Sequence, residues 1–295
     1  MSTINANIIN PYSPGIFSVN LNGVRVGSTL TTIQLGENTA TPASSDSVLI
    51  GKSSGNLLLA PSSNNTFVGY RSGKDCTTGS ANTLIGKSAG EKITSGTSNT
   101  FIGSNVAVNA TTGPANIAIG ESAGAGLTTG SSNIFIGNSC ANTPNITGIG
   151  NIVIGSGGGV NPSAANSVFE ITLGGPLTSA LRCAQTTITS LSDGRDKKDI
   201  TELRAGLSFV NKLKPVEFVW NDRDENGKRD IADFGFIAQD LKDTQEEVGL
   251  SETLKLVYET NPDKLEASYG KLVPILVKAI QDLSKELEDI KNKLN

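Results

Sequence analysis

The chain has 295 residues, a formal net charge of −4 and a hydrophobic fraction of 37%, which is below the average for globular domains. Its 33 glycines and 5% aromatic residues predict many turns and short strands, and they argue against an enzyme built around one deep pocket. The sequence contains no histidine, which excludes His-based triads and most zinc sites, and no basic run is long enough to follow a nucleic acid backbone.

The three cysteines, Cys76, Cys140 and Cys183, are far apart and odd in number. They therefore predict small buried side chains rather than a disulfide framework or a metal cluster, and we expect neither a metal nor a cofactor. The N-terminus, MSTINANIIN, lacks the basic and apolar regions of a signal peptide. No apolar stretch approaches the roughly 20 residues that span a bilayer, so we expect a protein made in the cytosol without a membrane partner.

Residues 1–45 are polar, and Thr, Asn and Gly alternate with Ile, Val and Leu, as in FSVNLNGVRVGSTLTTIQL. This alternation predicts a small N-terminal β element.

Residues 46–175 contain an internal repeat, Asn-(Thr/Ile)-x-(Val/Ile)-Gly. Its six copies begin at Asn65, Asn82, Asn99, Asn116, Asn133 and Asn151. Five of its glycines are each 17 residues apart: Gly69, Gly86, Gly103, Gly120 and Gly137. Each copy offers one short strand bounded by Gly and Asn, residue types that supply positive φ at tight turns. The regular period predicts a rod of stacked units.

One repeat unit cannot bury its own apolar face, so the units must stack along an axis. Stacking would align one residue of each unit in a continuous apolar column: Val68, Ile85, Ile102, Ile119, Ile136 and Ile154. A period of 17 residues suits a single-chain β-helix or β-roll, and it also suits three chains wound together. The repeat resembles the Asn- and Gly-rich β-roll repeats of trimeric adhesin heads and phage fibre shafts, and this resemblance favours a trimer.

Most charged residues follow Gly175, which predicts a linker over residues 176–191 and a separate domain over 192–295. Four blocks of this region carry a resemblance: ITSLSDGRDKKDI from Ile188, VNKLKPVEFVWN from Val210, DFGFIAQDL from Asp233, and YGKLVPILVKAIQDLSKELEDIKNKL from Tyr269. Together they resemble the C-terminal intramolecular chaperones of phage tailspikes and tail fibres, which are self-cleaving serine peptidases of the endosialidase type. The resemblance implies an α+β domain that trimerises the chain in front of it.

The family signature Ser-Asp-x-Arg-x-Lys is complete here as Ser192, Asp193, Arg195 and Lys197. The resemblance implies that Ser192 is the nucleophile, that Lys197 is its base, and that the bond between Leu191 and Ser192 is cut. A lysine can take a hydroxyl proton when burial or a neighbouring positive charge favours its neutral form, and Arg195 is a candidate for that charge. Asp196 would oppose this by pairing with Lys197. The other interpretation is a plain polar turn at Asp193-Gly194.

The segment that starts at Asn221 imitates a calcium loop, with Asp222, Asp224 and Asn226 at the expected offsets. Its flanks, VEFVW and FGFIA, are typical of strands rather than helices, so we favour a β-hairpin that turns at Asn226-Gly227. Trp220 would then be a core residue.

Residues 271–295 predict a coiled coil, because apolar residues alternate at spacings of four and three. They are Leu276, Ile280, Leu283, Leu287, Ile290 and Leu294. A solitary amphipathic helix packed on its own domain explains the same spacing.

The predicted fold class is therefore mainly β with a C-terminal α part: a β-roll or β-helix shaft, an α+β chaperone and a trimeric coiled coil. The predicted function is a structural viral fibre or spike in the virion, synthesised in the host cytoplasm, which releases its chaperone by autocleavage and attaches to virion proteins through residues 1–45. The alternative is a trimeric adhesin that binds a host receptor or glycan with its chaperone retained. A glycan-degrading spike and a membrane-bound transcription factor are the weaker alternatives, since the repeats lack a recurring carboxylate pair and the chain lacks an apolar span.

Overall fold

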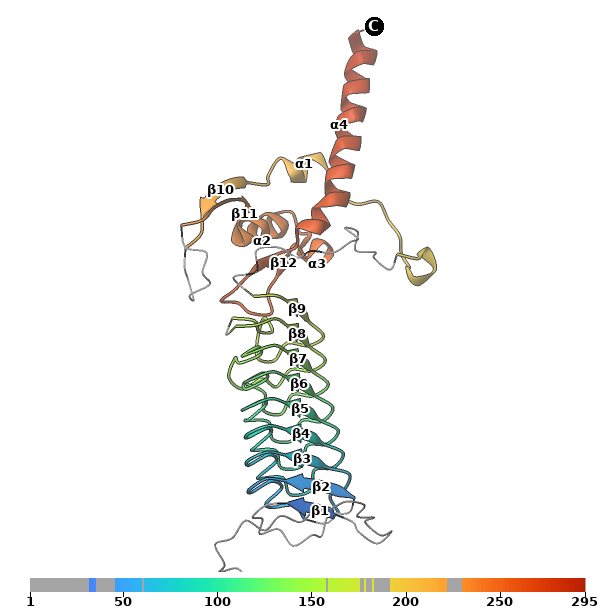
Figure 1. Cartoon of the computed structure of the whole chain (residues 1–295). Coiled ribbons are helices and arrows are strands. Elements are labelled where there is room, and N and C mark those ends of the chain that lie inside the picture. Colours follow the sequence, from blue (N-terminus) through green and yellow to red (C-terminus); the bar gives the residue numbers. More distant parts are fainter. Residues whose placement is uncertain are drawn as a thin grey trace, which may run out of the picture.

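The computed structural model describes residues 46–59, 61–157, 159–175, 178, 182, 192–221 and 230–294, together with the backbone of 32–35. These residues form a long stack of strands followed by a smaller C-terminal domain at one end of the stack (Figure 1). The last helix of that domain points away from the shaft.

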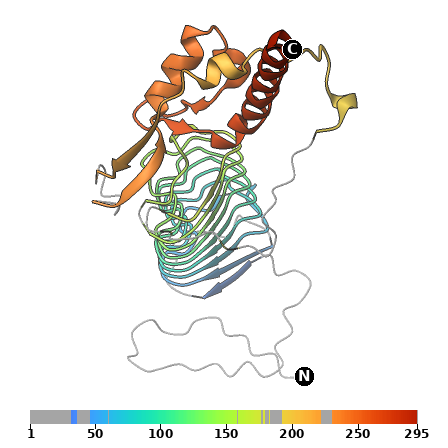
Figure 2. The same cartoon turned by 90° about the horizontal axis from the view of Figure 1, so that it is seen from above.

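The shaft is a parallel β-solenoid of about seven turns, which confirms the predicted repeat architecture. Its nine strands pair in sequence order, each with the next in parallel. They are β1 (Thr32–Leu35), β2 (Ser47–Ile50), β3 (Thr66–Val68), β4 (Thr83–Ile85), β5 (Thr100–Ile102), β6 (Ile117–Ile119), β7 (Ile134–Ile136), β8 (Ile152–Ile154) and β9 (Ile171–Leu173). Seen from above, the turns superimpose (Figure 2). One chain therefore completes the solenoid by itself.

The core of the solenoid is the middle residue of each short strand, not the column that the repeat predicted. The residues of the predicted column do pair in register, as in Val68 with Ile85, but they face outward and are partly exposed. Successive side chains of a strand point to opposite faces, so the variable position of the motif points inward. The fully buried column is Phe67, Leu84, Phe101, Ala118, Phe135 and Val153.

The asparagines of the repeat also differ from the prediction, because they form a buried ladder rather than supplying positive φ. The amide of Asn99 donates to Oδ1 of Asn82 (3.1 Å) and to the carbonyl of Gly113 (3.0 Å). Its own Oδ1 accepts from the backbone N–H of Asn116 (2.9 Å). The left-handed backbone conformation lies one residue earlier in each turn, as at Ser98 with a φ of 58°.

The repeated glycines allow the turns to stack closely. Gly103 has a φ of +141°, and a Cβ there would collide with the carbonyl of Gly120 in the next turn. Gly120 stands in the same relation to Gly137. The 17-residue spacing of the glycines thus follows from one contact repeated in each layer.

The C-terminal domain contains short elements and one long helix. They are η1 (Gly194–Asp196), α1 (Leu207–Val210), β10 (Pro215–Val219), β11 (Ala232–Phe236), α2 (Ala238–Glu247), α3 (Ser251–Leu254), β12 (Val257–Tyr258), β13 (Glu266–Ala267), η3 (Tyr269–Lys271) and α4 (Leu272–Leu294). A small core joins α1, α3 and the start of α4 through Phe209, Leu254, Leu272 and Ile275. No helix in the described part of the chain has the length and apolar character needed to cross a membrane.

β10 and β11 form the antiparallel hairpin expected for the segment around Asn221. The turn that joins them, with the calcium-like residues, lies outside the described residues. The prediction that Trp220 is a core residue is wrong, because Trp220 lies half-buried on the hairpin. Its indole packs edge-on against Phe218 and donates to the carboxylate of Asp233 (3.1 Å).

Two of the predicted buried cysteines, Cys76 and Cys140, lie inside the solenoid, and burial raises the pKa of each thiol to about 11. Cys183 lies outside the described residues.

Candidate functional site

The predicted nucleophile and base meet at the start of the C-terminal domain. The ammonium of Lys197 donates to Oγ of Ser192 (2.6 Å) and to the Ser192 carbonyl (3.2 Å). The intervening turn, η1, brings the two side chains together although they are five residues apart. Leu191, whose carbonyl forms the predicted scissile bond, lies outside the described residues.

Asp193 and Arg195 organise the turn between them. The carboxylate of Asp193 caps η1 by accepting from the backbone N–H of Arg195 (2.9 Å). The Arg195 guanidinium also donates to both carboxylate oxygens, from Nε (3.0 and 3.1 Å) and from a terminal nitrogen (2.5 Å). These bonds hold the pKa of Asp193 below its usual range and raise that of Arg195. The charge of Arg195 is thus directed to Asp193.

This segment is a solvent-exposed loop in the single chain. Every residue from Ser192 to Ile200 is exposed. The η1 segment also lies apart from the other elements of its domain in both views (Figures 1 and 2). No ion pair joins Asp196 to Lys197 within the described segment, so the competing contact expected from the sequence is absent in this arrangement. A lysine becomes a base in a dry or electropositive environment, and this exposed loop is not dry in the single chain.

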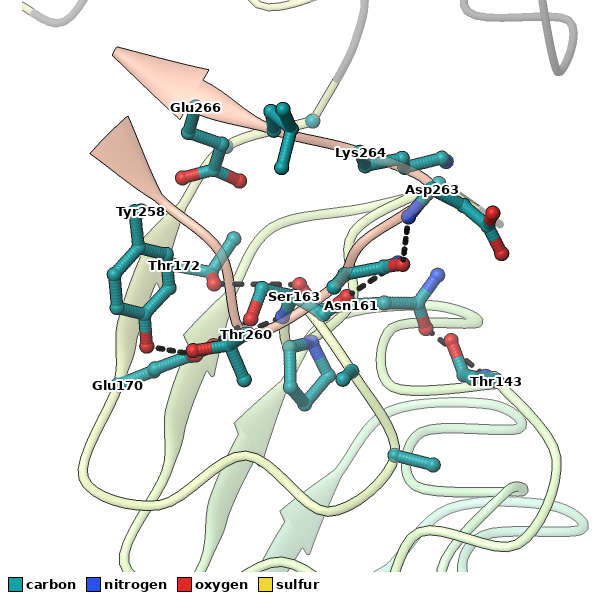
Figure 3. Close-up of a pocket in the computed structure, with 18 of the residues that line it drawn as sticks. Thr143, Asn161, Ser163, Glu170, Thr172, Tyr258, Thr260, Asp263, Lys264 and Glu266 are labelled. Carbon is teal, nitrogen blue, oxygen red and sulfur yellow. Dashed lines mark hydrogen bonds between the residues drawn. The ribbon is translucent and has the colours of Figure 1, made fainter. Parts of the chain in front are cut away.

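A second cluster, which the sequence did not predict, joins the end of the shaft to the C-terminal domain (Figure 3). The hydroxyl of Tyr258 donates to the carboxylate of Glu170 (2.5 Å), and the amide of Asn261 donates to the Ser163 carbonyl (3.0 Å). Ser163 itself donates to Glu170 through its backbone N–H (2.8 Å) and its hydroxyl (2.5 Å). We call these four residues the junction cluster.

The carboxylates at the junction have opposing pKa shifts. Partial burial acts to raise the pKa of Glu170, but the hydrogen bonds from Ser163 and Tyr258 outweigh it and hold this pKa below its ordinary value of 4.5. Burial, and secondarily the charge of Glu170, raise the pKa of Glu266. An open cavity of about 1770 Å³ surrounds the cluster and extends to Trp220 and Lys264. A negative charge is thus favoured at Glu170 and disfavoured at Glu266.

No signal in the sequence singled out the junction cluster, because its partners are 88 and 98 residues apart along the chain. Among the described residues, no group of three or more Cys, Asp or Glu side chains is placed to hold a metal ion.

The architecture defines a class: a β-solenoid shaft that carries a small C-terminal domain, an arrangement that fits a phage fibre or spike protein. Residues 192–250 match the model of a peptidase family described as chaperone of endosialidase. The match begins at Ser192 and includes Lys197 and the β10–β11 hairpin, whereas the shaft and α4 lie outside it. Comparisons with curated proteins and with solved structures give no significant match.

Proposed function

We propose that this chain is a structural fibre or spike of a virus, and that its C-terminal domain trimerises the shaft and then releases itself by one cleavage before Ser192. The observation that carries the proposal is the contact between Lys197 Nζ and Ser192 Oγ inside the matched segment. A serine hydroxyl is a weak nucleophile until a neighbouring group takes its proton, and this lysine is within reach of that proton.

The cleavage proceeds in two steps. Neutral Lys197 takes the hydroxyl proton while Ser192 Oγ bonds to the Leu191 carbonyl carbon, and the proton then passes to the Ser192 nitrogen as the C–N bond breaks. The resulting ester joins Leu191 to Oγ. Water hydrolyses this ester, which frees the Leu191 carboxylate and restores the Ser192 hydroxyl. Each chain turns over once, since its substrate is its own peptide bond.

The trimer is supported by the apolar seam of α4. The six residues of the predicted heptad pattern are 44–82% exposed in the single chain: Leu276, Ile280, Leu283, Leu287, Ile290 and Leu294. Within the described part of the chain, the buried residues of α4 lie in its first half, namely Leu272, Ile275 and Ala279. A solitary helix packed on its own domain would bury this seam, whereas a coiled coil explains its exposure.

A trimerising end domain solves the register problem of a repetitive shaft. Every turn presents nearly the same strand to its neighbours, so a shift by one repeat between chains is almost as favourable as the correct alignment. Three parallel α4 helices would align the three chains at the same residues, so that their repeats are in register before the shafts associate.

Exposure of Ser192 and Lys197 suggests that cutting waits for assembly. The single chain leaves Ser192 and Lys197 exposed to solvent, whereas a lysine base requires exclusion of water or a nearby positive charge. A neighbouring subunit that covers this loop would exclude water from it. Cleavage would then follow trimerisation and make assembly kinetically irreversible.

A trimeric adhesin that keeps its chaperone is the second candidate. The open cavity at the junction favours it, because Trp220 and polar side chains such as Asn161 and Asp263 line this cavity, and sugars are held by such combinations. Glycan-array binding by the purified full chain, weakened in Trp220→Ala, is the expected result for that candidate.

Denaturing electrophoresis with intact-mass analysis tests the proposal on four proteins. The wild-type chain should give fragments that end at Leu191 and begin at Ser192. Ser192→Ala and Lys197→Ala should stay intact, while the neighbouring Lys198→Ala should still be cut. All four proteins should have a trimeric mass by light scattering, because trimerisation depends on the packed domain and α4.

The outcomes separate the parts of the proposal. Cleavage that persists in Ser192→Ala, or cleavage at another bond, contradicts the Ser-Lys mechanism. A wild-type chain that stays intact contradicts the release step and leaves the chaperone role to the mass measurement. A monomeric mass at micromolar concentration contradicts the trimer.

A further inference from the structure

The outward face of the shaft sheet is unusually apolar. Each strand from β3 to β9 places its first and third residues on this face, because the middle residue points inward. The third residues form a column of Val, Ile and Leu, and those from Ile85 to Ile154 are 36–41% exposed. From β6 onward the first residues are also isoleucines, namely Ile117, Ile134, Ile152 and Ile171. We call the outward residues of β6 to β9 the isoleucine face.

No charged residue interrupts this face. All outward positions from β3 to β9 are Thr, Val, Ile or Leu. Neighbouring strands lie about 4.8 Å apart, so the two columns extend over roughly 29 Å. A sheet face that remains in water normally alternates with polar or charged side chains, which also prevent edge and face aggregation. The composition of this face therefore indicates that another surface covers it.

The occupant must match the face in period and chemistry. A partner that packs along the whole face has to present apolar side chains at the same interval, one layer of the stack at a time. The face lacks the aromatic and hydrogen-bonding side chains that a glycan site needs. A second copy of this shaft, parallel and at the same height, carries the required pattern in every layer.

The exposed seam of α4 supports the same arrangement independently. A parallel coiled coil would bring three chains together with equal lengths, so each layer of one shaft would stand beside the same layer of its neighbours. The apolar character of the face is strongest in β6 to β9, the end of the shaft nearest this helix (Figure 1).

We infer that three complete solenoids pack side by side through their isoleucine faces around a common axis, rather than winding their chains together. This inference rests on the trimer of the proposed function and deepens it by naming the contact surface. The contact starts at β9, beside the chaperone, and extends toward β6. The Thr residues that occupy the first outward positions of β3 to β5 make the far half of the interface weaker.

Site-directed thiols test the inference in the full chain. Ile119→Cys places a thiol on the isoleucine face, and Lys92→Cys places one at an exposed position about halfway around a turn. The native Cys76 and Cys140 are buried, and wild type measures the background from every native thiol. A short bismaleimide should link Ile119→Cys into dimers on a denaturing gel and leave Lys92→Cys at the wild-type background. Native maleimide labelling should be several-fold slower at residue 119 than at residue 92.

Light scattering on the same samples distinguishes the failures. A trimeric mass with cross-links at residue 92, or with a freely labelled and unlinked thiol at residue 119, overturns the side-by-side packing and leaves the trimer intact. A protected but unlinked thiol at residue 119 also overturns it, because something other than a second copy then covers the face. A monomeric mass overturns the proposed trimer itself. Ile119→Ser changes the same outward position without adding a thiol and keeps the buried core column unchanged. It therefore shows whether loss of the isoleucine alone disturbs folding.

Discussion

Replacing one rung of the asparagine ladder should destabilise the shaft strongly. Asn99→Ala leaves the Gly113 carbonyl and the Asn116 backbone N–H without the partners that they use. Asn99 and Asn116 are fully buried, so water cannot substitute without rearrangement. Each stranded group costs about 1–3 kcal/mol, and the two together cost about 2–6 kcal/mol. This loss is a large part of the roughly 5–15 kcal/mol that stabilises a typical protein.

Guanidinium unfolding followed by circular dichroism, at one fixed protein concentration, measures this loss. The matched control is Asn138→Ala, since Asn138 is exposed and its side chain makes one long bond, to Glu121 (3.3 Å). We expect its unfolding free energy to stay within about 0.5 kcal/mol of wild type. Equal unfolding midpoints for the two variants would refute the energetic role assigned to the ladder.

Two further predictions concern the chaperone domain. Because the pKa of Glu170 lies below its ordinary 4.5 in the docked state, its contribution to docking is complete above about pH 4.5 and is lost as the pH falls through the docked pKa. Tyr258→Phe removes one donor to Glu170 and should move the loss of docking to higher pH. The emission of Trp220 measures this loss. Tyr70→Phe on the shaft should not move it. A Glu266→Gln background isolates this effect, because the raised pKa of Glu266 makes its charge oppose docking at neutral pH; an unshifted transition in Tyr258→Phe speaks against the contact. Expression of residues 1–191 alone should give aggregated or misregistered shaft by size-exclusion chromatography, whereas shaft freed by cleavage after assembly should stay soluble. A truncated chain that reaches the same trimeric shaft as the full chain argues against the chaperone role.

The sequence predicted the rod, the hairpin and the last helix because each has a period. The 17-residue repeat, the strand-like flanks of Asn221 and the heptad spacing of α4 are local patterns that fix local structure. The prediction placed the wrong face of each strand inside the solenoid, because the regular Val or Ile of the motif was more conspicuous than the variable residue beside it. Alternation within the three-residue strand carries that information, and Phe67, Phe101 and Phe135 at the variable position were the available sign.

The candidate cleavage residues lie in one six-residue motif, which gained its meaning from the three other blocks of the resemblance, and the structure brings Ser192 and Lys197 together as a local turn. The junction cluster was inaccessible to such reasoning. Glu170 and Tyr258 come into contact because the C-terminal domain docks on the end of the shaft, and no periodic pattern encodes a contact of that kind. Domain boundaries at residues 45, 175 and 191, and the attachment role of residues 1–45, stay predictions.

The last rung of the ladder connects the shaft interior to its end. Oδ1 of Asn151 accepts from the backbone N–H of Glu170 (3.0 Å), and the side chain of Glu170 accepts from Tyr258. β9 is the final strand of the sheet, so its outer edge would be a template for further strands if nothing covered it. The C-terminal domain contacts Glu170, the residue directly before β9, and so lies beside this edge. A shaft expressed without this domain would leave the edge uncovered during folding, when the unpaired edges of two chains can pair with each other.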